Sequence, residues 1–395
     1  MNGSGLDLGV NRSYNERMKL TLRIRLLPTA EQTALLLSTV ERFNQAATFA
    51  ARAGFDAKVY SQPSIHKLAY AEIRARFGLS AQMAVRAIGK AVETFKTLRA
   101  KGREECPTFK PRGAVTYDER IIGFKGLDRV SLWALGGRRV VPIAFGEYQG
   151  ERIGRIKGQA DLVYRNGQFH LFCTVDLPEE PAEDIKDFLG VDLGIVELAT
   201  DSDGNSYTGE AVEKVRRRKH EARRSYQKTG TKSAKRRLKQ LARSEADFRR
   251  NENHVISKRL VSLAKDTGRG IAVEDLNGIR DRTTVRRKDR ARHSGWSFAQ
   301  LQAFIGYKAK LVGVPVVFVE ARNTSRTCSR CGHCEKANRK NQAEFECLQC
   351  GHSENADRNA ARNVRDRATL RWLDLVAGVD PRLKPLGNLA ASPRL

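Results

Sequence analysis

The spacing of apolar residues changes along the chain and marks where one kind of element gives way to another. Between Met18 and Leu26, apolar side chains occupy every second position, and Lys, Thr or Arg lies between them. A period of two is typical of a strand with one buried face. We therefore predict a half-buried strand with a basic outer face, which ends before Pro28.

Helical spacing follows this strand. Thr29 lies three residues before Gln32, which is the spacing of a capping box and predicts the start of a helix. Gly54 is predicted to end that helix, because glycine readily adopts the left-handed conformation found after a last helical turn. Two more helical patterns follow, so residues 29–105 are expected to form a helical domain.

The period returns to two after residue 105, where Asn166-Gly167 between two apolar runs is typical of a β-hairpin turn. We expect residues 17–28 and 106–180 to form a small β-barrel of the oligonucleotide-binding type. The helical domain would be inserted between these two segments. A linker rich in Pro and Glu then separates this half from a second domain.

The second half alternates apolar runs with helical patterns, which is typical of an α/β domain. Residues 186–209 predict two strands with a turn between them, and residues 268–278 and 312–321 each contain a further buried strand. Residues 213–250 hold 16 basic residues and 4 acids. We expect this basic segment to form a helical pair that is broken near Thr229-Gly230.

The charge of the chain favours a nucleic-acid partner. Lys and Arg number 72 and Asp and Glu number 45, which gives a formal net charge of +27 and a pI near 10.1. Such an excess favours a polyanion, because each neutralised phosphate releases counterions. A membrane surface is the alternative, but no apolar run approaches spanning length. Because the first residues lack an apolar secretion signal, we expect a cytoplasmic protein.

Five of the seven cysteines lie in one short segment, which indicates a metal site in a reducing compartment and not a disulfide framework. Two Cys-x-x-Cys pairs are separated by fifteen residues, and a glycine follows each pair. Four thiolates would complete the tetrahedral coordination of one structural Zn²⁺. The predicted zinc ligands are Cys328, Cys331, Cys347 and Cys350, and the spare candidates are His333, Cys334 and His352.

Three acidic residues interrupt or end apolar segments: Asp192 in one strand, Glu274 at the end of another, and Asp357 at an expected helix N-terminus. Each alone would usually be a turn or cap residue. In an RNase H-like fold, however, acids in these three positions converge and can hold two Mg²⁺ ions about 4 Å apart. The order Asp, Glu, Asp fits RuvC-type nucleases, whereas the usual transposase order places the Glu last.

Several strings of residues match one known family. They are "GVDLGI" around Asp192, "VEDL" at Glu274, "LRIRLLPTAEQ" and "PTFKPRG" in the first half, and residues 296–332 and 345–363 around the cysteine pairs. On these residues the chain resembles TnpB, the transposon-encoded relatives of the compact type V CRISPR effectors. The likeness covers most of the chain and is weakest in the helical domain and the C-terminal tail.

The resemblance implies an RNA-guided DNA endonuclease that reads a short motif beside its double-stranded target and cuts both strands in one RuvC site. It also implies that Asp192, Glu274 and Asp357 bind Mg²⁺, and that one guide RNA from a transposon end binds a monomer. The implied domains are a flexible leader (1–16), a wedge barrel (17–28 and 106–180), a helical recognition domain (29–105), a RuvC domain (185–325 and 353–372), a zinc ribbon inserted into it (326–352) and a tail (373–395).

In that setting the basic segment would contact the backbone of guide RNA or of the RNA–DNA duplex, which can be read by its shape alone. The predicted nucleic-acid contacts are Arg216, Arg217, Arg218, Arg223, Arg224, Lys235, Arg236 and Arg237, with Arg339 and Lys340 in the zinc ribbon.

Other functions stay open at this point: a type V CRISPR effector, a transposase, a zinc-containing DNA-binding regulator without catalysis, or a junction resolvase. A transposase would need a strand-transfer site, and the chain lacks a nucleophilic Tyr in a His-hydrophobic-His setting. The three intact acids argue against a regulator without catalysis. If the protein were a junction resolvase, the N-terminal half would have no assigned function.

Overall fold

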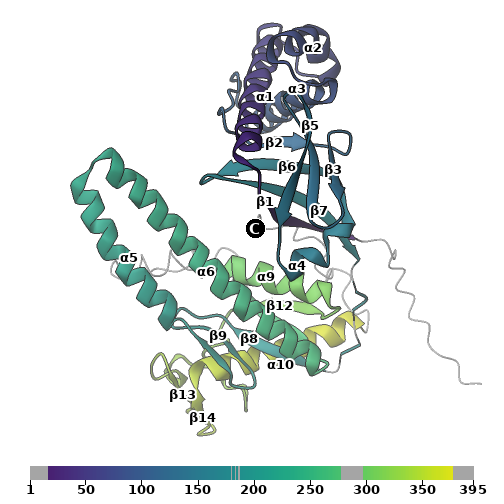
Figure 1. Cartoon of the computed structure of the whole chain (residues 1–395). Helices are drawn as coiled ribbons and strands as arrows, with labels where there is room; N and C mark the ends of the chain where they lie inside the picture. The colour runs from purple at the N-terminus through teal and green to yellow at the C-terminus, as the bar shows by residue number, and fades with distance from the viewer. Residues whose placement is uncertain (1–16, 179, 183, 186, 277–296, 377–395) are drawn as a thin grey trace, which may run out of the picture. The chain divides into compact units, whose positions relative to one another are not determined.

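The computed structural model describes residues 17–178, 180–182, 184–185, 187–276 and 297–376. The chain divides between Leu177 and Pro178 into two compact units (Figure 1). None of the helices in the described ranges has the length and the apolar character of a membrane span. The predicted leader, residues 1–16, and most of the predicted tail lie outside the described residues.

Seven strands of the first unit form one curved sheet in the order β2-β6-β7-β1-β5-β4-β3. The edge strands β2 and β3 follow one another in sequence, and the Tyr117 hydroxyl at the end of β2 donates to the Trp133 carbonyl on β4, 2.8 Å away. The sheet is therefore a nearly closed barrel, as predicted. Its strands are β1 (Arg17–Leu26), β2 (Val115–Tyr117), β3 (Ile122–Lys125), β4 (Arg129–Ala134), β5 (Gly137–Ala144), β6 (Ile156–Arg165) and β7 (Gln168–Pro178).

The alternating apolar residues predicted to face inward on β1 are buried, from Leu20 to Leu26. β6 and β7 pair antiparallel, and the turn between them has positive φ at both Asn166 (54°) and Gly167 (78°). Two positive φ values are what a tight hairpin turn of type I′ requires, so the predicted hairpin is confirmed. Two short helices, α4 (Glu147–Gly150) and η1 (Ile153–Arg155), connect β5 to β6.

Three helices lie in the chain between β1 and β2: α1 (Ala30–Asp56), α2 (Gln62–Phe77) and α3 (Ala81–Ala100). The predicted capping box of Thr29 and Gln32 is present at the start of α1. The prediction that Gly54 ends this helix is wrong, because α1 continues to Asp56. Glycine is needed at this position for close packing, since a Cβ there would lie 2.7 Å from the Ile65 side chain of α2.

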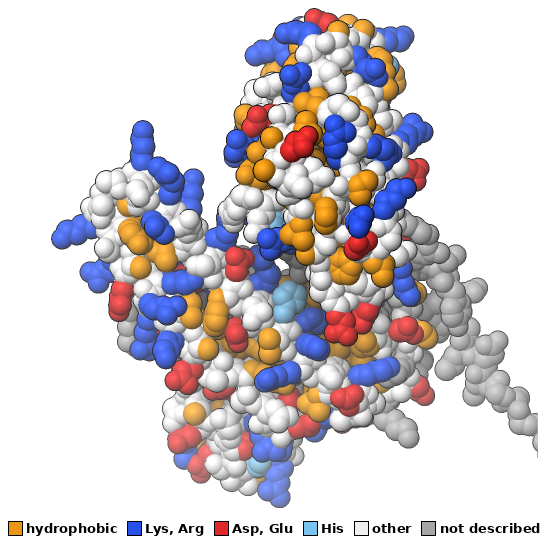
Figure 2. All heavy atoms as spheres, in the orientation of Figure 1, with side chains coloured by type: hydrophobic (Ala, Val, Ile, Leu, Met, Phe, Trp, Pro, Cys, Tyr) orange, Lys and Arg blue, Asp and Glu red, His pale blue; other side chains and the backbone are white. Residues whose placement is uncertain are grey.

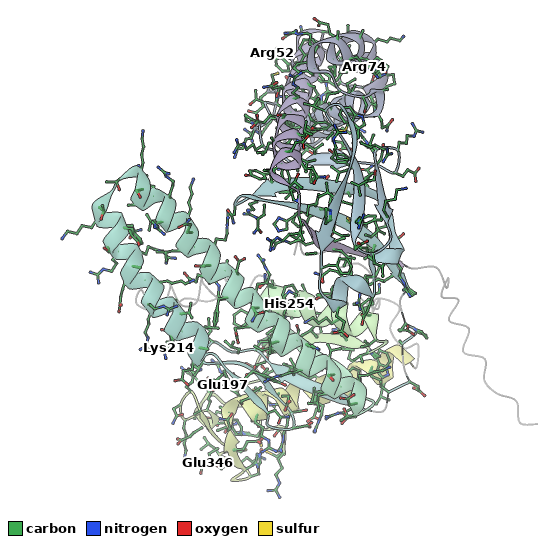
Figure 3. The ribbon with its side chains drawn as sticks, viewed as in Figure 1. Arg52, Arg74, Glu197, Lys214, His254 and Glu346 are labelled. Carbon is green, nitrogen blue, oxygen red and sulfur yellow. The ribbon has the colours of Figure 1, made fainter. Side chains whose placement is uncertain are left out.

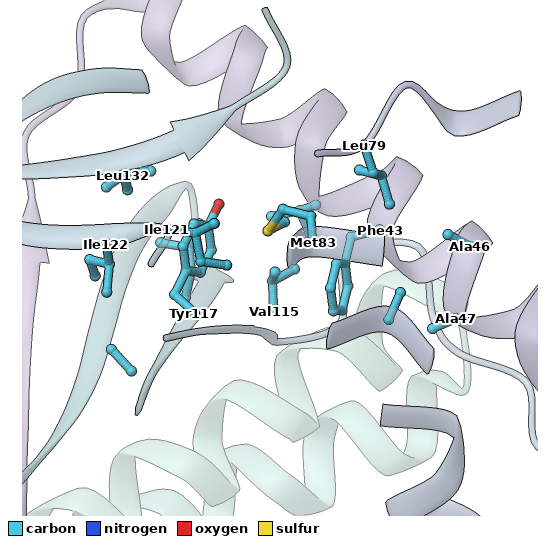
Figure 4. Close-up of a cluster of buried hydrophobic side chains, with 14 of the residues drawn as sticks. Phe43, Ala46, Ala47, Leu79, Met83, Val115, Tyr117, Ile121, Ile122 and Leu132 are labelled. Carbon is cyan, nitrogen blue, oxygen red and sulfur yellow. The ribbon is translucent and has the colours of Figure 1, made fainter. Parts of the chain in front are cut away.

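The helices and the barrel share one hydrophobic core. Figure 4 shows Phe43 of α1 and Met83 of α3 beside Val115 and Tyr117 of β2. Phe43, Met83 and Tyr117 are among the largest side chains that are fully buried. The helices are therefore fixed to the barrel by apolar contacts.

The second unit contains a five-stranded sheet in the order β10-β9-β8-β11-β12. β8, β11 and β12 run parallel, whereas β9 pairs antiparallel with both β8 and β10. The prediction of two strands in residues 186–209 missed β10, because three residues are too few to show a period. The strands are β8 (Phe188–Asp192), β9 (Glu197–Asp201), β10 (Ser206–Thr208), β11 (Gly270–Asp275) and β12 (Val316–Glu320).

Helices cover both faces of this sheet (Figure 1). Leu189 and Val273 pack on the side of α6 (Lys232–Asp266) and α9 (Phe298–Leu311), and Ala272 packs on the side of α10 (Ala356–Val376). α10 lies very close to β8, since a Cβ on Gly190 would be 2.0 Å from the Ala361 carbonyl oxygen.

The basic segment forms the predicted helical pair, α5 (Glu210–Thr229) and α6, broken at Gly230 with φ 67°. The hairpin extends away from the sheet (Figure 1), and no residue of α5 is buried. Residues 326–355, which we name the cysteine ribbon, precede α10 and contain the strand pair β13 (Glu344–Glu346) and β14 (Ser353–Asn355) and the short helix η2 (Lys336–Asn338).

Candidate active site and metal centre

Three carboxylates meet at one end of the five-stranded sheet. Asp192 is the last residue of β8, Glu274 lies next to the end of β11, and Asp357 lies in the first turn of α10. Because β8 and β11 are parallel neighbours, their carboxyl ends lie side by side. Ala272 pairs with Gly190, and alternation places Glu274 and Asp192 on the same face as these two small residues, the face that α10 covers.

The carboxylates of this acidic cluster affect one another electrostatically. Burial and the neighbouring charges of Glu274 and Asp357 raise the pKa of Asp192 well above its usual value. Burial also raises the pKa of Glu274 and that of Asp357. Buried carboxylates that repel one another are costly to ionise unless cations approach them. A cation near this cluster would relieve that repulsion.

A cation from the cysteine ribbon already reaches this cluster. The Arg339 Nη2 atom lies 3.1 Å from Asp357 Oδ1, and the same guanidinium donates to the carbonyls of Asn341 and Gln342. Arg339 was predicted as a phosphate contact, and here its charge and its hydrogen bond oppose the rise that burial causes in the pKa of Asp357. Lys340, predicted with it, pairs with Glu346 within the ribbon and is exposed.

Glu274 is held by a residue that the sequence analysis did not single out for function. The hydroxyl of Thr324, which is 3% exposed, donates to Glu274 Oε1 and lowers the pKa of that carboxyl against the effect of burial. Asn363 of α10 in turn donates to the carbonyl of Thr324 at 2.8 Å. The only sequence signal was the position of Thr324 just before the first cysteine pair.

A fourth carboxylate lies near the cluster and was also missed. Glu197, the first residue of β9, is labelled in Figure 3. Burial and the charge of Asp357 raise its pKa, and its Oε2 atom is buried without a hydrogen-bond partner among the described residues. Nothing in its local sequence separates it from an ordinary strand-edge acid.

The four predicted zinc ligands come together in the cysteine ribbon, with all four sulfur atoms within 4.8 Å of one another. The Sγ–Sγ distances are 3.7 Å for Cys328 and Cys350 and 3.5 Å for Cys331 and Cys347. A tetrahedral site with Zn–S bonds of about 2.3 Å has sulfur–sulfur edges of about 3.8 Å, so the arrangement fits zinc.

The glycines that follow the two pairs, Gly332 and Gly351, have φ values of 76° and 69°, which closes each Cys-x-x-Cys turn. The spare candidates lie outside this group of four: Cys334 is exposed, and His352 Nε2 is 2.9 Å from Glu354. α10 binds the ribbon through Asn359, which accepts from the Ser329 N–H and donates to the Thr327 carbonyl.

The predicted basic residues of the α5–α6 hairpin differ in their exposure and in whether they form ion pairs. Arg216 and Arg217 pair with Glu213, and Arg223 pairs with Glu245. Lys and Arg side chains project from the hairpin into solvent (Figure 2). The predicted contacts with exposed side chains and no acidic partner among the described residues are Arg218, Arg224, Lys235, Arg236 and Arg237.

Two family models match the chain. Residues 170–280 match the model described as "Probable transposase", and residues 298–364 match the model described as "Cas12f1-like, TNB domain". The fold is similar to that in the solved structure titled "Cryo-EM structure of the Cas12f1-sgRNA-target DNA complex". That match has a TM-score of 0.60 at 14% identity and covers 88% of this chain and 98% of the other.

Several curated proteins also have sequences similar to this chain. The CRISPR-associated endodeoxyribonuclease Cas12f1 of Sulfoacidibacillus thermotolerans is 32% identical over 218 residues, which are 51% of this chain and 50% of that protein. The chain thus matches about half the length of this relative. The putative RNA-guided DNA endonuclease InsQ of Escherichia coli is 28% identical over 72% of both chains, and the TnpB-like protein MJ0751 of Methanocaldococcus jannaschii is 42% identical over 80 residues. The chain is therefore similar, over the residues that these matches cover, to TnpB-like and Cas12f proteins.

Proposed function

We propose that this chain is an RNA-guided DNA endonuclease that hydrolyses phosphodiester bonds at the acidic cluster. The main observation in support of the proposal is that Asp192, Glu274 and Asp357 lie near one another at one end of the sheet. The strand order β10-β9-β8-β11-β12, with the first three strands antiparallel and the last two parallel to β8, supports an RNase H-like domain of RuvC type. In this proposal residues 185–325 and 353–372 form the nuclease, and residues 326–352 form the inserted zinc ribbon.

The acidic cluster would hold two Mg²⁺ ions, which supply Lewis-acid stabilisation of the attacking and leaving oxygens when bound. Asp192, Glu274 and Asp357 would be the ligands. Thr324 fixes the direction of the Glu274 carboxylate, and Arg339 neutralises Asp357 in the metal-free protein. One Zn²⁺ held by the four cysteines would keep the ribbon folded, and so keep Arg339 in place.

Guide RNA and double-stranded target DNA are the proposed partners. The net charge of +27, the exposed basic residues of the α5–α6 hairpin and the printed names of the relatives support this assignment. The barrel and the three-helix domain of the first unit would form the wedge and recognition parts, which read the motif beside the target. We propose a monomer with one RNA that acts in the cytoplasm at the nucleoid.

The first test is to purify the protein without nuclease treatment and to sequence the RNA that accompanies it. One dominant RNA with a constant part and a variable 3′ end would define the guide. Its origin would separate a transposon-end RNA from a CRISPR repeat array. Heterogeneous RNA, or none, would favour a DNA-binding regulator without guided cleavage.

The defined guide then permits a cleavage assay on matched target DNA. We expect both strands to be cut in the presence of Mg²⁺. The Asp192→Ala variant should lose cleavage and keep RNA and DNA binding, because only a metal ligand is removed. Equal cutting by the variant, or cutting without the guide, would contradict the proposal.

A further inference from the structure

The core packing of β9 determines which way the Glu197 side chain points. Asp192 pairs with Thr200 of β9, and residues that pair across neighbouring strands point to the same face of a sheet. Regular alternation from Thr200 would direct Leu198 to that face and Glu197 to the opposite face. Leu198 and its neighbour Ala199, however, both pack in the core on the side of α6 and α9. The alternation is therefore interrupted between Thr200 and Glu197.

A β-bulge accounts for this interruption. In the pairing of β9 with β10, Ala199 lies opposite Tyr207. The next pair is Glu197 and Thr208, so Leu198 is an extra residue on β9. An extra residue in one strand reverses the alternation beyond it, and bulges are frequent next to active sites because they redirect a side chain. Glu197 consequently points to the face that α10 covers, which is the face of the acidic cluster.

Two glycines hold the backbone around this bulge. The Gly209 N–H donates to the Val196 carbonyl at 2.8 Å. A Cβ on Gly209 would lie 2.8 Å from the Leu198 side chain, and a Cβ on Gly194 would lie 2.5 Å from the Glu197 carbonyl oxygen. The backbone on both sides of Glu197 is therefore closely packed, and the fold itself fixes the direction in which this side chain leaves β9.

The Glu197 carboxylate forms no ion pair within the described residues. Its Oε2 atom is buried without a hydrogen bond to any of them, and burial together with the charge of Asp357 raises its pKa. Arg339 does not neutralise it, because this guanidinium already pairs with Asp357 and with two backbone carbonyls. Buried polar atoms without a partner are rare in folded proteins and require an explanation.

Other acids close to Glu197 in the chain show what a structural carboxylate looks like in this fold. Asp201 accepts hydrogen bonds from the backbone N–H groups of Asp203 and Asn205 and from the Asn205 side chain. Asp203 accepts from Arg269 through two hydrogen bonds of 2.9 and 2.6 Å. Glu197 has neither kind of partner in the described part of the chain, so a role in holding β9 and β10 together does not account for it.

We propose that Glu197 is a fourth carboxylate ligand of the divalent-cation site at the acidic cluster, on the side of Asp357. Carboxylate oxygens are among the ligands that Mg²⁺ uses in proteins. The formal charge of four carboxylates equals in size that of two divalent cations, which is the number proposed for this site. This inference rests on the proposed function, because it extends the cation site of that function by one residue.

Binding of Mn²⁺ to the full, zinc-loaded chain without nucleic acid tests the assignment. Mn²⁺ binds to oxygen ligands as Mg²⁺ does, and the electron paramagnetic resonance signal of the free ion reports how much Mn²⁺ is bound. The sites that are lost in Asp192→Ala define binding at the acidic cluster. Glu197→Gln keeps the size of the side chain and should weaken Mn²⁺ binding at these sites by about tenfold or more, since even a residue that only supports a metal ligand is typically worth about 10–100-fold. Equal Mn²⁺ affinities of Glu197→Gln and the wild type would overturn the proposal.

Two further variants separate a cation ligand from other roles. Glu221→Gln makes the same substitution at an exposed position of α5 and should leave Mn²⁺ binding unchanged. Glu197→Asp keeps the carboxylate and should restore part of the affinity that Glu197→Gln loses. In chelator, Glu197→Gln removes a carboxylate that Asp357 repels, so its melting temperature should equal or exceed that of the wild type. A lower melting temperature in chelator, with no recovery of Mn²⁺ affinity in Glu197→Asp, would show a structural role and would also overturn the proposal.

Failure of this inference can be told apart from failure of the proposed function, because Mn²⁺ binding requires no cleavage. Guided cutting by the wild type, with equal Mn²⁺ affinity in Glu197→Gln, would keep the nuclease and remove Glu197 from the cation site. Weaker Mn²⁺ binding by Glu197→Gln, without guided cutting by the wild type, would keep the four-carboxylate site and remove the nuclease.

Discussion

At the scale of single residues, the acidic cluster depends on neighbours that are not acids. The Thr324 hydroxyl holds Glu274, and α10 holds the Thr324 backbone through Asn363. Thr324→Val keeps the shape and removes the donor, so Glu274 loses its fixed direction. Loss of such a supporting bond typically costs about 10–100-fold in metal affinity or activity.

The measurement is the cleavage rate as a function of Mg²⁺ concentration. Thr324→Val should need more Mg²⁺ for half-maximal cutting, whereas Thr324→Ser keeps the hydroxyl and should behave like the wild type. If valine left the Mg²⁺ dependence unchanged, Thr324 would have no positioning role.

The raised pKa of Asp192 in the acidic cluster also predicts an effect on thermal stability. Because burial and like charges raise the pKa of Asp192, its ionised form is disfavoured in the folded protein and destabilises it at neutral pH. Asp192→Asn should therefore raise the melting temperature of the metal-free protein by a few degrees, at about 2–4 °C per kcal/mol. Added Mg²⁺ should stabilise the wild type and not this variant. A lower melting temperature for Asp192→Asn in chelator would refute this account.

His254 gives a pH dependence that is independent of the metal site. It stacks on Phe304 with ring centroids 4.0 Å apart, and burial, aided by Lys308 and Arg250, lowers its pKa from 6.5 to about 4. The folded protein then binds fewer protons than the unfolded chain between these values, so stability falls as the pH drops from 6.5 toward 4. His254→Phe keeps the stacking and should lessen that fall in thermal unfolding. An identical pH profile for the variant would show that His254 does not contribute.

At the scale of elements, close contact between α10 and β8 brings Asp357 to Asp192. Gly190 makes this contact possible, because a Cβ there would lie 2.0 Å from the Ala361 carbonyl oxygen. Gly190→Ala should cost about 1–3 kcal/mol or more through overpacking and should impair cleavage by moving α10. Gly306→Ala in α9 is the matched control, because a Cβ at Gly306 meets nothing within 4 Å. It should be stabilising by about 0.5–1 kcal/mol. Urea unfolding of both variants checks the pair, and equal effects would contradict the packing argument.

Elements with a local signal could be predicted from the sequence. The hairpin at Asn166-Gly167, the helix break at Gly230 and the cysteine quartet each depend on a few adjacent or regularly spaced residues. The prediction for Gly54 was wrong because a glycine in a helical pattern can mark either the end of the helix or a close contact with a neighbouring helix. The contacts of Arg339 with Asp357 and of Thr324 with Glu274 could not be predicted, since they depend on how distant segments fold onto one another. The three acids were grouped only because a known fold places acids in such positions.

At the scale of the whole molecule, the positive charge is concentrated where it can contact a long polyanion. α5 has no buried residue, and Arg236 of α6 is exposed, so arginines of the hairpin can be changed without disturbing a core. The triple variant Arg218→Gln/Arg224→Gln/Arg236→Gln should keep the wild-type melting temperature and bind guide RNA with a smaller salt dependence. Each lost phosphate contact reduces the slope of log affinity against log salt by about 0.7–0.9.

The measurement is RNA affinity at several salt concentrations, with the triple variant compared against the wild type. If the slope is reduced and cutting at saturating RNA is unchanged, the hairpin contributes to RNA binding and has no further role in cleavage. A reduced slope with slower cutting at saturation would extend its role to the RNA–DNA duplex, because that duplex forms only when the target is engaged. An unchanged slope would remove the hairpin from the nucleic-acid interface. The charge that binds RNA would then lie on other basic residues of the chain.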